Sequence, residues 1–318
     1  MSAATDSLRA SITAEAAQPI SEAPAALVAA IRRRHGRSAA AVLFYGSCLR
    51  RADPTAAEDP VYDFYLLVDE YRQAYQGRLA ALANAVLPPN VFYLETPWRD
   101  RTLRAKYAVV SLPQFQRAVS ARAFHSYFWA RFAQPVRLAH VRDDGVRGVV
   151  LEALADAVVT LATRTHGLLD DRFASAEFWT RAFQATYAAE LRAEGTERAR
   201  LIYEADSGRY DRLTETALRA AGFTVEATVD GRLSVPTAAR DRSAARIVWW
   251  LRRLVGKLLS VLRLAKGVFT FDGGIDYILW KIERHSGVKA MATPWQRRHP
   301  LLAAPGLAWR LFRRGAFR

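Results

Sequence analysis

The chain has 318 residues and a mass of 35.5 kDa; 51% of its residues are hydrophobic and 24% are charged. This balance is typical of a globular protein with a buried core, and it excludes collagen-like and globally disordered chains. The net charge is +15, and residues 246–318 alone hold 15 Lys and Arg against 3 Asp and Glu. A near-neutral body with a basic tail indicates an anionic partner: membrane lipid, nucleic acid or a polyphosphate.

Three further features limit the class of protein. The single cysteine, Cys48, cannot form an internal disulfide, and no cysteine cluster is present to hold zinc. The longest uncharged stretch, residues 79–94, has 16 residues and is interrupted by two prolines, whereas a helix needs about 20 apolar residues to span a bilayer. Residues 1–22 contain acidic side chains and no apolar core, so we expect a disordered lead-in rather than a secretory signal. We therefore expect a protein of the reducing cytoplasm.

Residues 23–143 are expected to form a first domain. Apolar spacing predicts a mixture of helices and short strands, in the order helix, strand, loop, strand, helix, strand, strand, helix. Such an order is typical of an α+β fold in which helices cover a small mixed sheet. The predicted helices are 23–34, 70–87 and 115–132, and the predicted strands are 40–45, 62–68, 90–95 and 104–111.

Residues 144–243 are expected to form a second, mainly helical domain. Four helices are predicted, over 146–169, 177–191, 196–203 and 210–221. Alternating segments then flank Asp230-Gly231, which predicts a β-hairpin. Helices followed by a hairpin favour a winged-helix-like arrangement.

Residues 244–318 form a basic amphipathic region, beginning with a helix predicted over 244–265. Two explanations for its amphipathic pattern remain open, insertion into the interface of an anionic membrane and packing of the apolar face on the body. Nucleic-acid binding is the least favoured alternative. One face of this helix carries Ile247, Leu251, Leu254, Leu258, Val261 and Leu262, and the other carries Arg246, Arg252, Arg253, Lys257 and Arg263.

The segment 42–69 holds the clearest chemical signal. A predicted strand ends in Gly46-Ser47, and the next predicted strand begins with Asp63. Glycine lets the backbone approach the phosphates of a nucleotide, and the serine hydroxyl and nearby N–H groups can donate to them. An aspartate on the neighbouring strand can hold Mg²⁺ against the same phosphates. This arrangement is typical of polymerase-β-type nucleotidyltransferases.

The pattern is incomplete. A second carboxylate two residues after the first would share its strand face, but Tyr65 occupies that position. Glu95 and Asp69 are candidate replacement ligands, although Asp69 would lie about 20 Å from Asp63 along the strand. The alternative is that Gly46-Ser47 is an ordinary turn and Asp63 an edge-strand residue.

Read in order along the chain, several short motifs resemble the mitochondrial-type phosphatidate cytidylyltransferases, the peripheral CDP-diacylglycerol synthases also known as translocator-maintenance proteins. The resemblance covers about residues 40–285. Ala108 replaces a glycine of the family, Phe132 replaces a leucine, and residues 164–241 match poorly. The matching motifs are Tyr45-Gly46-Ser47, Asp63-Phe64, Val68-Asp69, Lys106-Tyr107-Ala108-Val109, Tyr127 with Arg131-Phe132 and Pro135-Val136, and Lys266-Gly267-Val268-Phe269-Thr270 with Gly274.

The resemblance implies an Mg²⁺-dependent reaction of CTP with phosphatidate that yields CDP-diacylglycerol and pyrophosphate at the inner face of the cell membrane. It assigns catalysis to Asp63 and Lys106, and the binding of nucleotide phosphates to Tyr45, Gly46, Ser47, Lys106 and Arg131. Physically, Lys106 supplies a point charge and Arg131 a bidentate clamp. The simpler alternatives are a surface lysine and an arginine at a helix end.

Two other functions remain open. One is a nucleotidyltransferase with a soluble or RNA acceptor. The other is a non-catalytic nucleotide- or lipid-binding relative, which the tyrosine at position 65 favours.

Overall fold

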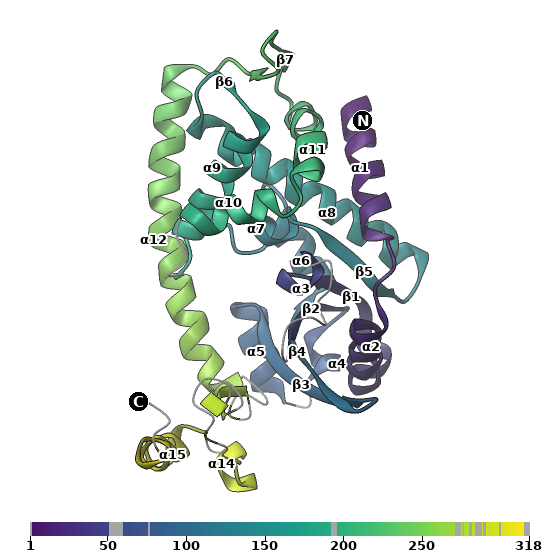
Figure 1. Cartoon of the computed structure of the whole chain (residues 1–318), viewed down its shortest axis with the longest axis vertical. Coiled ribbons are helices and arrows are strands. Elements are labelled where there is room, and N and C mark those ends of the chain that lie inside the picture. Colours follow the sequence, from purple (N-terminus) through teal and green to yellow (C-terminus); the bar gives the residue numbers. More distant parts are fainter. Residues whose placement is uncertain are drawn as a thin grey trace.

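The computed structural model describes residues 2–50, 60–75, 77–191, 196–270, 275, 277–279, 282–283, 288, 291–298 and 300–314. A five-stranded sheet of order β3-β4-β2-β1-β5 forms its centre (Figure 1). The neighbours β2 and β4 are parallel, and the other pairs are antiparallel, so the predicted small mixed sheet of an α+β fold is confirmed. The strands are β1 Ala39–Tyr45, β2 Val61–Val68, β3 Asn90–Trp98, β4 Arg101–Ser111 and β5 Val136–Val141.

The central strands β1 and β2 are almost wholly buried because helices cover both faces of the sheet. Alternate side chains enter two separate hydrophobic clusters: Val42 and Phe64 face one, Leu43 and Tyr65 face the other. The first cluster lies under α2 (Glu22–His35). The second lies under α6 (Leu112–Val119), α7 (Trp129–Phe132) and α8 (Asp144–Thr165). Burial on both faces explains why these strands read as continuous apolar runs.

Two predicted helices are interrupted. The helix expected over 70–87 divides into α4 (Tyr71–Ala74) and α5 (Arg78–Val86), because Tyr75 is extended and Gly77 begins the second helix. The helix expected over 115–132 divides into α6 and α7, with turns between them. Strand β5 was not predicted from the sequence, since as an edge strand it is buried fully only at Val136.

The expectation of a disordered lead-in is wrong. Residues 3–16 form helix α1 (Ala3–Ala16), which begins at the N-cap Ser2 and buries Leu8, Ile12 and Ala16. These side chains recur at helical spacing and pack on α8 and on α11 (Ser207–Ala220).

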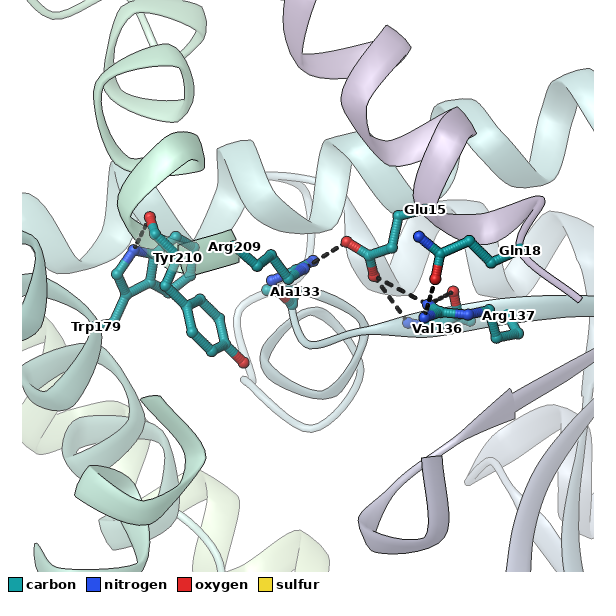
Figure 2. Close-up of polar contacts among 8 residues, drawn as sticks. All are labelled: Glu15, Gln18, Ala133, Val136, Arg137, Trp179, Arg209 and Tyr210. Carbon is teal, nitrogen blue, oxygen red and sulfur yellow. Dashed lines mark hydrogen bonds and ion pairs between the residues drawn. The ribbon is translucent and has the colours of Figure 1, made fainter. Parts of the chain in front are cut away.

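A buried polar contact fixes α1 at its C-terminal end (Figure 2). The carboxylate of Glu15 accepts hydrogen bonds from the Arg209 side chain and, at 3.1 Å, from the backbone N–H of Val136. The Arg209 guanidinium also donates to the carbonyl of Ala133 at 3.1 Å and is only 4% exposed. The N-terminal helix thus joins the sheet to α11.

The mainly helical segment from 144 to 235 contains the predicted helices and hairpin in the predicted order. Its hairpin turns at Gly231, whose φ of +76° favours glycine, and forms a three-stranded sheet of order β6-β8-β7. Besides α8 and α11 it contains α9 Ser175–Ala188, α10 Thr196–Glu204, β6 Arg172–Phe173, β7 Glu226–Ala227 and β8 Leu233–Ser234.

The long helix α12 (Ala239–Thr270) runs along one side of the molecule (Figure 1). Its Gly256 lies against the residue that follows α9: a Cβ at Gly256 would lie 2.2 Å from the carbonyl oxygen of Ala189. Its inward side is partly cationic: Arg252 donates to the carbonyl of Phe124, Arg263 to that of Pro88, and Lys266 to those of Leu87 and Pro89. Two further helices, α14 (Pro294–Arg298) and α15 (Pro300–Arg313), follow it.

The apolar stripe of α12, defined as Ile247, Leu251, Leu254, Leu258, Val261 and Leu262, faces away from the body. Its side chains are 42–61% exposed, so packing of this stripe as core does not occur in the described part of the chain. None of the helices described is long and apolar enough to cross a membrane.

Candidate active site at the Gly46–Asp63 contact

Gly46 and Asp63 lie in direct contact on adjacent strands. Tyr45, the last residue of β1, is the register partner of Asp63 on β2, and Gly46 follows with a φ of +91°. A Cβ at position 46 would lie 3.0 Å from Oδ2 of Asp63 and 3.2 Å from its Cβ. The backbone therefore turns beside the carboxylate in a conformation and a space that only glycine fits. This is the close approach expected from the sequence.

Lys106 stands on the other side of Asp63. The two residues are register partners on the parallel strands β2 and β4, and Nζ of Lys106 lies 4.0 Å from Oδ1 of Asp63. Their side chains are 34% and 28% exposed. Nζ also lies 5.2 Å from the ring centroid of Tyr277, whose ring contacts that of Tyr93 on β3. The structure thus brings together Gly46, Asp63 and Lys106.

Tyr45 and Ser47 flank the glycine. Ser47 begins the single helical turn α3 (Ser47–Arg50) and is half-buried. The ring of Tyr45 packs on those of Tyr65 and Phe132, at centroid distances of 5.2 and 6.1 Å. Tyr45 therefore serves as a packing residue at the edge of the site in this structure, and Ser47 is placed beside Gly46.

Arg50 is a neighbour of the site that the sequence did not single out. Its Nη1 donates to Oε1 of Gln134 at 3.0 Å. Burial lowers the pKa of the guanidinium, and the negative charge of Asp63 opposes that shift. Tyr187 of α9 and Tyr210 of α11 act on the same guanidinium, so Arg50 lies where the sheet meets the helical domain. Its position three residues after Ser47 was the only signal in the sequence.

Arg131 lies deeper than a phosphate clamp at an open site would. Its Nη2 is 3.5 Å from Oε2 of Glu190, its Nη1 donates to the carbonyl of Tyr127, and its guanidinium stacks 4.2 Å from the Tyr127 ring centroid. The side chain is 12% exposed. In this structure Arg131 ties α7 to the end of α9, and its contact with a nucleotide stays a prediction.

Glu95 is not brought to Asp63. It accepts hydrogen bonds from Tyr93 Oη at 2.7 Å and from Arg104 Nε at 3.0 Å. Because β4 lies between β3 and β2 and the register is offset by two residues, the Cα atoms of Glu95 and Asp63 are about 12 Å apart. In this arrangement the Glu95 carboxylate is held by Tyr93 and Arg104 rather than beside Asp63.

Asp69 lies at the opposite end of β2. Its carboxylate forms an ion pair with the guanidinium of Arg142, and it lines a separate cavity of about 640 Å³. The described ranges contain no group of three His, Cys, Asp or Glu side chains that could hold a metal. Among the carboxylates proposed from the sequence, Asp63 is the one that lies beside Gly46 and Lys106 in the described part of the chain, and it suits Mg²⁺ only when further oxygen ligands such as substrate phosphates and water complete the octahedron.

Two sequence predictions fall on residues outside the description. Residues 51–59, which join α3 to β2, are not described, and neither is Gly274 of the C-terminal motif. Lys266 of that motif is described; its ammonium donates to carbonyls at the end of α5, and burial followed by the charge of Arg263 lowers its pKa to about 8.

Neither a family model nor a curated protein matches this chain. The chemistry must therefore be inferred from the geometry. A carboxylate with an ammonium 4.0 Å away and a glycine backbone against it can hold a divalent cation and receive the negative oxygens of a polyphosphate.

Proposed function

We propose that the protein is an Mg²⁺-dependent nucleotidyltransferase of the polymerase-β type and that it makes CDP-diacylglycerol and pyrophosphate from CTP and phosphatidate. The observation that carries the proposal is the contact between Gly46 and Asp63. Asp63 would hold Mg²⁺, which when bound neutralises charge on the transferred phosphorus and the leaving pyrophosphate. Lys106, 4.0 Å from Asp63, would bind an oxygen of the same phosphates.

The choice of a lipid acceptor is supported by α12. Its apolar stripe points away from the body, and Arg246, Arg253 and Lys257 are exposed along one flank. An exposed apolar face with a basic flank is typical of helices that lie in the interface of an anionic membrane. We propose that α12 holds the enzyme on the cytoplasmic face of such a membrane, where phosphatidate resides.

The test is release of pyrophosphate by the purified full chain with Mg²⁺ and phosphatidate in detergent micelles. CTP, ATP and GTP are compared, each with and without the lipid. The proposal expects release only with CTP and phosphatidate together. Release without lipid would keep the nucleotidyl chemistry and replace the acceptor with a soluble molecule or RNA. No release from folded protein with any nucleotide would contradict the enzymatic proposal.

Tyr65 favours a second candidate, a non-catalytic nucleotide- or lipid-binding protein. It occupies the position of the second carboxylate, is 1% exposed, and packs against Phe128 and Phe132. Calorimetric titration with CTP and Mg²⁺ separates the two candidates. Saturable binding without pyrophosphate release would support the second.

A further inference from the structure

A cavity of about 480 Å³ lies between the N-terminal half of α12 and the helical domain, away from Asp63 along the chain and in the fold. The C-terminal end of α8, the segment after the hairpin and α12 form its walls. The charged, polar and aromatic side chains that line it include Arg164, His166, Phe223, Thr237, Trp249 and Arg252. Its volume is within the range of small-ligand sites.

Arg252 is the unusual member of this wall. It is 1% exposed, and its Nε donates to the carbonyl of Phe124 at 2.6 Å, which fixes one edge of the guanidinium. Within the described part of the chain, neither Nη1 nor Nη2 has a hydrogen-bond partner. A buried guanidinium without an acceptor for its terminal nitrogens destabilises the fold, because those N–H groups have lost their hydrogen bonds to water and form none within the protein.

The surroundings of Arg252 offer aromatic faces instead of a carboxylate. Its guanidinium carbon lies 4.5 Å from the ring centroid of Trp249, 5.1 Å from that of Phe124 and 5.7 Å from that of Trp129. Burial, followed by the like charge of Arg164, lowers the pKa of Arg252 to about 10, so the side chain stays cationic at neutral pH. The acidic residue on the cavity wall, Asp241, is exposed and pairs with Arg240 at 3.6 Å.

Among the described residues around this cavity, the buried side-chain atoms without a hydrogen-bond partner include two further donors, besides Oγ1 of Thr165 and Nδ1 of His166, which can also accept. Nε of Arg164 and Nε1 of Trp129 are buried without a partner in the structure as described, like the two Nη atoms of Arg252. These nitrogens carry N–H groups and cannot accept. Fixed donors and two cations in one place call for a ligand that supplies acceptor oxygens and negative charge.

We propose that this cavity is a second anion site, in which the free edge of the Arg252 guanidinium binds two oxygens of a phosphate group. The planar fork of arginine matches phosphate in a bidentate manner. Phe223 and Trp249 on the wall would pack against an apolar part attached to the phosphate. The source of the phosphate is either a small soluble phosphate or the headgroup of a phospholipid.

The test measures the melting temperature of the full chain at constant ionic strength while inorganic phosphate replaces chloride. Monomeric dioctanoyl phosphatidate is the second probe. Wild type is expected to show a saturable rise of at least about 2 °C with one of the two probes. A response to inorganic phosphate identifies a free phosphate as sufficient, and a response to the lipid alone identifies the headgroup.

Three variants test whether the rise in melting temperature depends on Arg252. Arg252→Met should abolish it, and Arg252→Lys, which keeps the charge without the fork, should weaken binding at least about tenfold. Arg181→Met is the control, since it removes an exposed charge from α9, outside the basic flank of α12, and it should respond like wild type. Without ligand, Arg252→Met should melt no lower than wild type, because loss of the hydrogen bond from Nε to Phe124 is offset by removal of a buried cation whose two Nη atoms have no partner in the structure as described.

Other outcomes overturn the inference. A response that survives in Arg252→Met but disappears in Lys106→Met belongs to the nucleotide site. One such outcome is that neither probe raises the melting temperature. Another is that Arg252→Met melts well below wild type without ligand while Arg252→Lys binds the probe normally. Either outcome would make Arg252 a structural residue that anchors Phe124. The result is independent of whether pyrophosphate is released, so it stands apart from the proposed function.

Discussion

The carboxylate of Asp63 fills the space beside Gly46 that any larger residue would need. A Cβ on residue 46 would lie 3.0 Å from Oδ2 of Asp63, on a backbone with a φ of +91°. Two constraints thus act on one position: the left-handed backbone and the carboxylate beside it.

Gly46→Ala separates these constraints when it is compared with Gly222→Ala. Gly222 has a φ of +89° but nothing within 4 Å of an added Cβ. Both variants should lose about 1 kcal/mol of unfolding free energy from backbone strain. Only Gly46→Ala should displace the Asp63 carboxylate and reduce pyrophosphate release, by about tenfold or more. Urea unfolding and the release assay measure the two effects, and equal activity in both variants would contradict a role for the contact.

The α1 helix should contribute strongly to stability through Glu15. Replacing Glu15 by Ala leaves the buried guanidinium of Arg209 without its carboxylate. The expected cost is about 3 kcal/mol, as for other broken buried pairs. Glu152→Ala is the control, because it removes a carboxylate that pairs with Arg9 of the same helix at an exposed position. A similar midpoint of urea unfolding for both variants would show that the Glu15 contact is unimportant.

Acid should destabilise the fold partly through His125. Burial, followed by the charge of Arg263, lowers its pKa to about 4. In the unfolded chain this imidazole is protonated below about pH 6.5, whereas in the folded chain it is protonated only below about pH 4. The contribution of neutral His125 to the free energy of unfolding is therefore complete above pH 6.5 and is lost as the pH falls toward 4. The change is on the order of 3 kcal/mol. His125→Gln should flatten the dependence of the urea midpoint on pH over this interval, and an unchanged slope would contradict the assignment.

The apolar stripe of α12 should bind membranes without supporting the fold. Leu254→Ser with Leu258→Ser removes two side chains that are 51% and 60% exposed. Unfolding free energy should change by less than about 0.5 kcal/mol for each, whereas binding to phosphatidate-containing vesicles should fall at least about tenfold.

A matched pair outside α12, Leu201→Ser with Val229→Ser, removes exposed apolar side chains of similar size. This control should sediment with vesicles as wild type does. If the α12 pair also binds like wild type, the stripe faces another partner.

Much of the sheet was predictable from local pattern. Strands β1 and β2 are apolar runs with clear ends, because both faces are buried and Gly46 stops the first of them. Strand β5 was missed because its residues are mostly half-buried. Helix α1 was missed because its polar composition hides three apolar residues four apart, and because its anchor at Arg209 lies 194 residues away in sequence.

The candidate site was predictable only as far as adjacent strands allowed. The neighbourhood of Gly46 and Asp63 follows from two consecutive strands. The approach of Arg50 to the helical domain and of Tyr277 to Lys106 depends on tertiary packing, which no local pattern encodes. The outward orientation of the apolar stripe of α12 has the same origin: the buried arginines of this helix meet backbone carbonyls and aromatic rings from distant segments.

The most direct test of the account compares two carboxylates on one strand, Asp63→Asn and Asp69→Asn, in the pyrophosphate-release assay with CTP, Mg²⁺ and phosphatidate. Asp63→Asn should lower release at least about a hundredfold while the fold is retained. Asp69→Asn, which breaks only the ion pair with Arg142 at the far end of β2, should stay close to wild type. Full activity in folded Asp63→Asn would contradict the central claim that this carboxylate holds the catalytic metal.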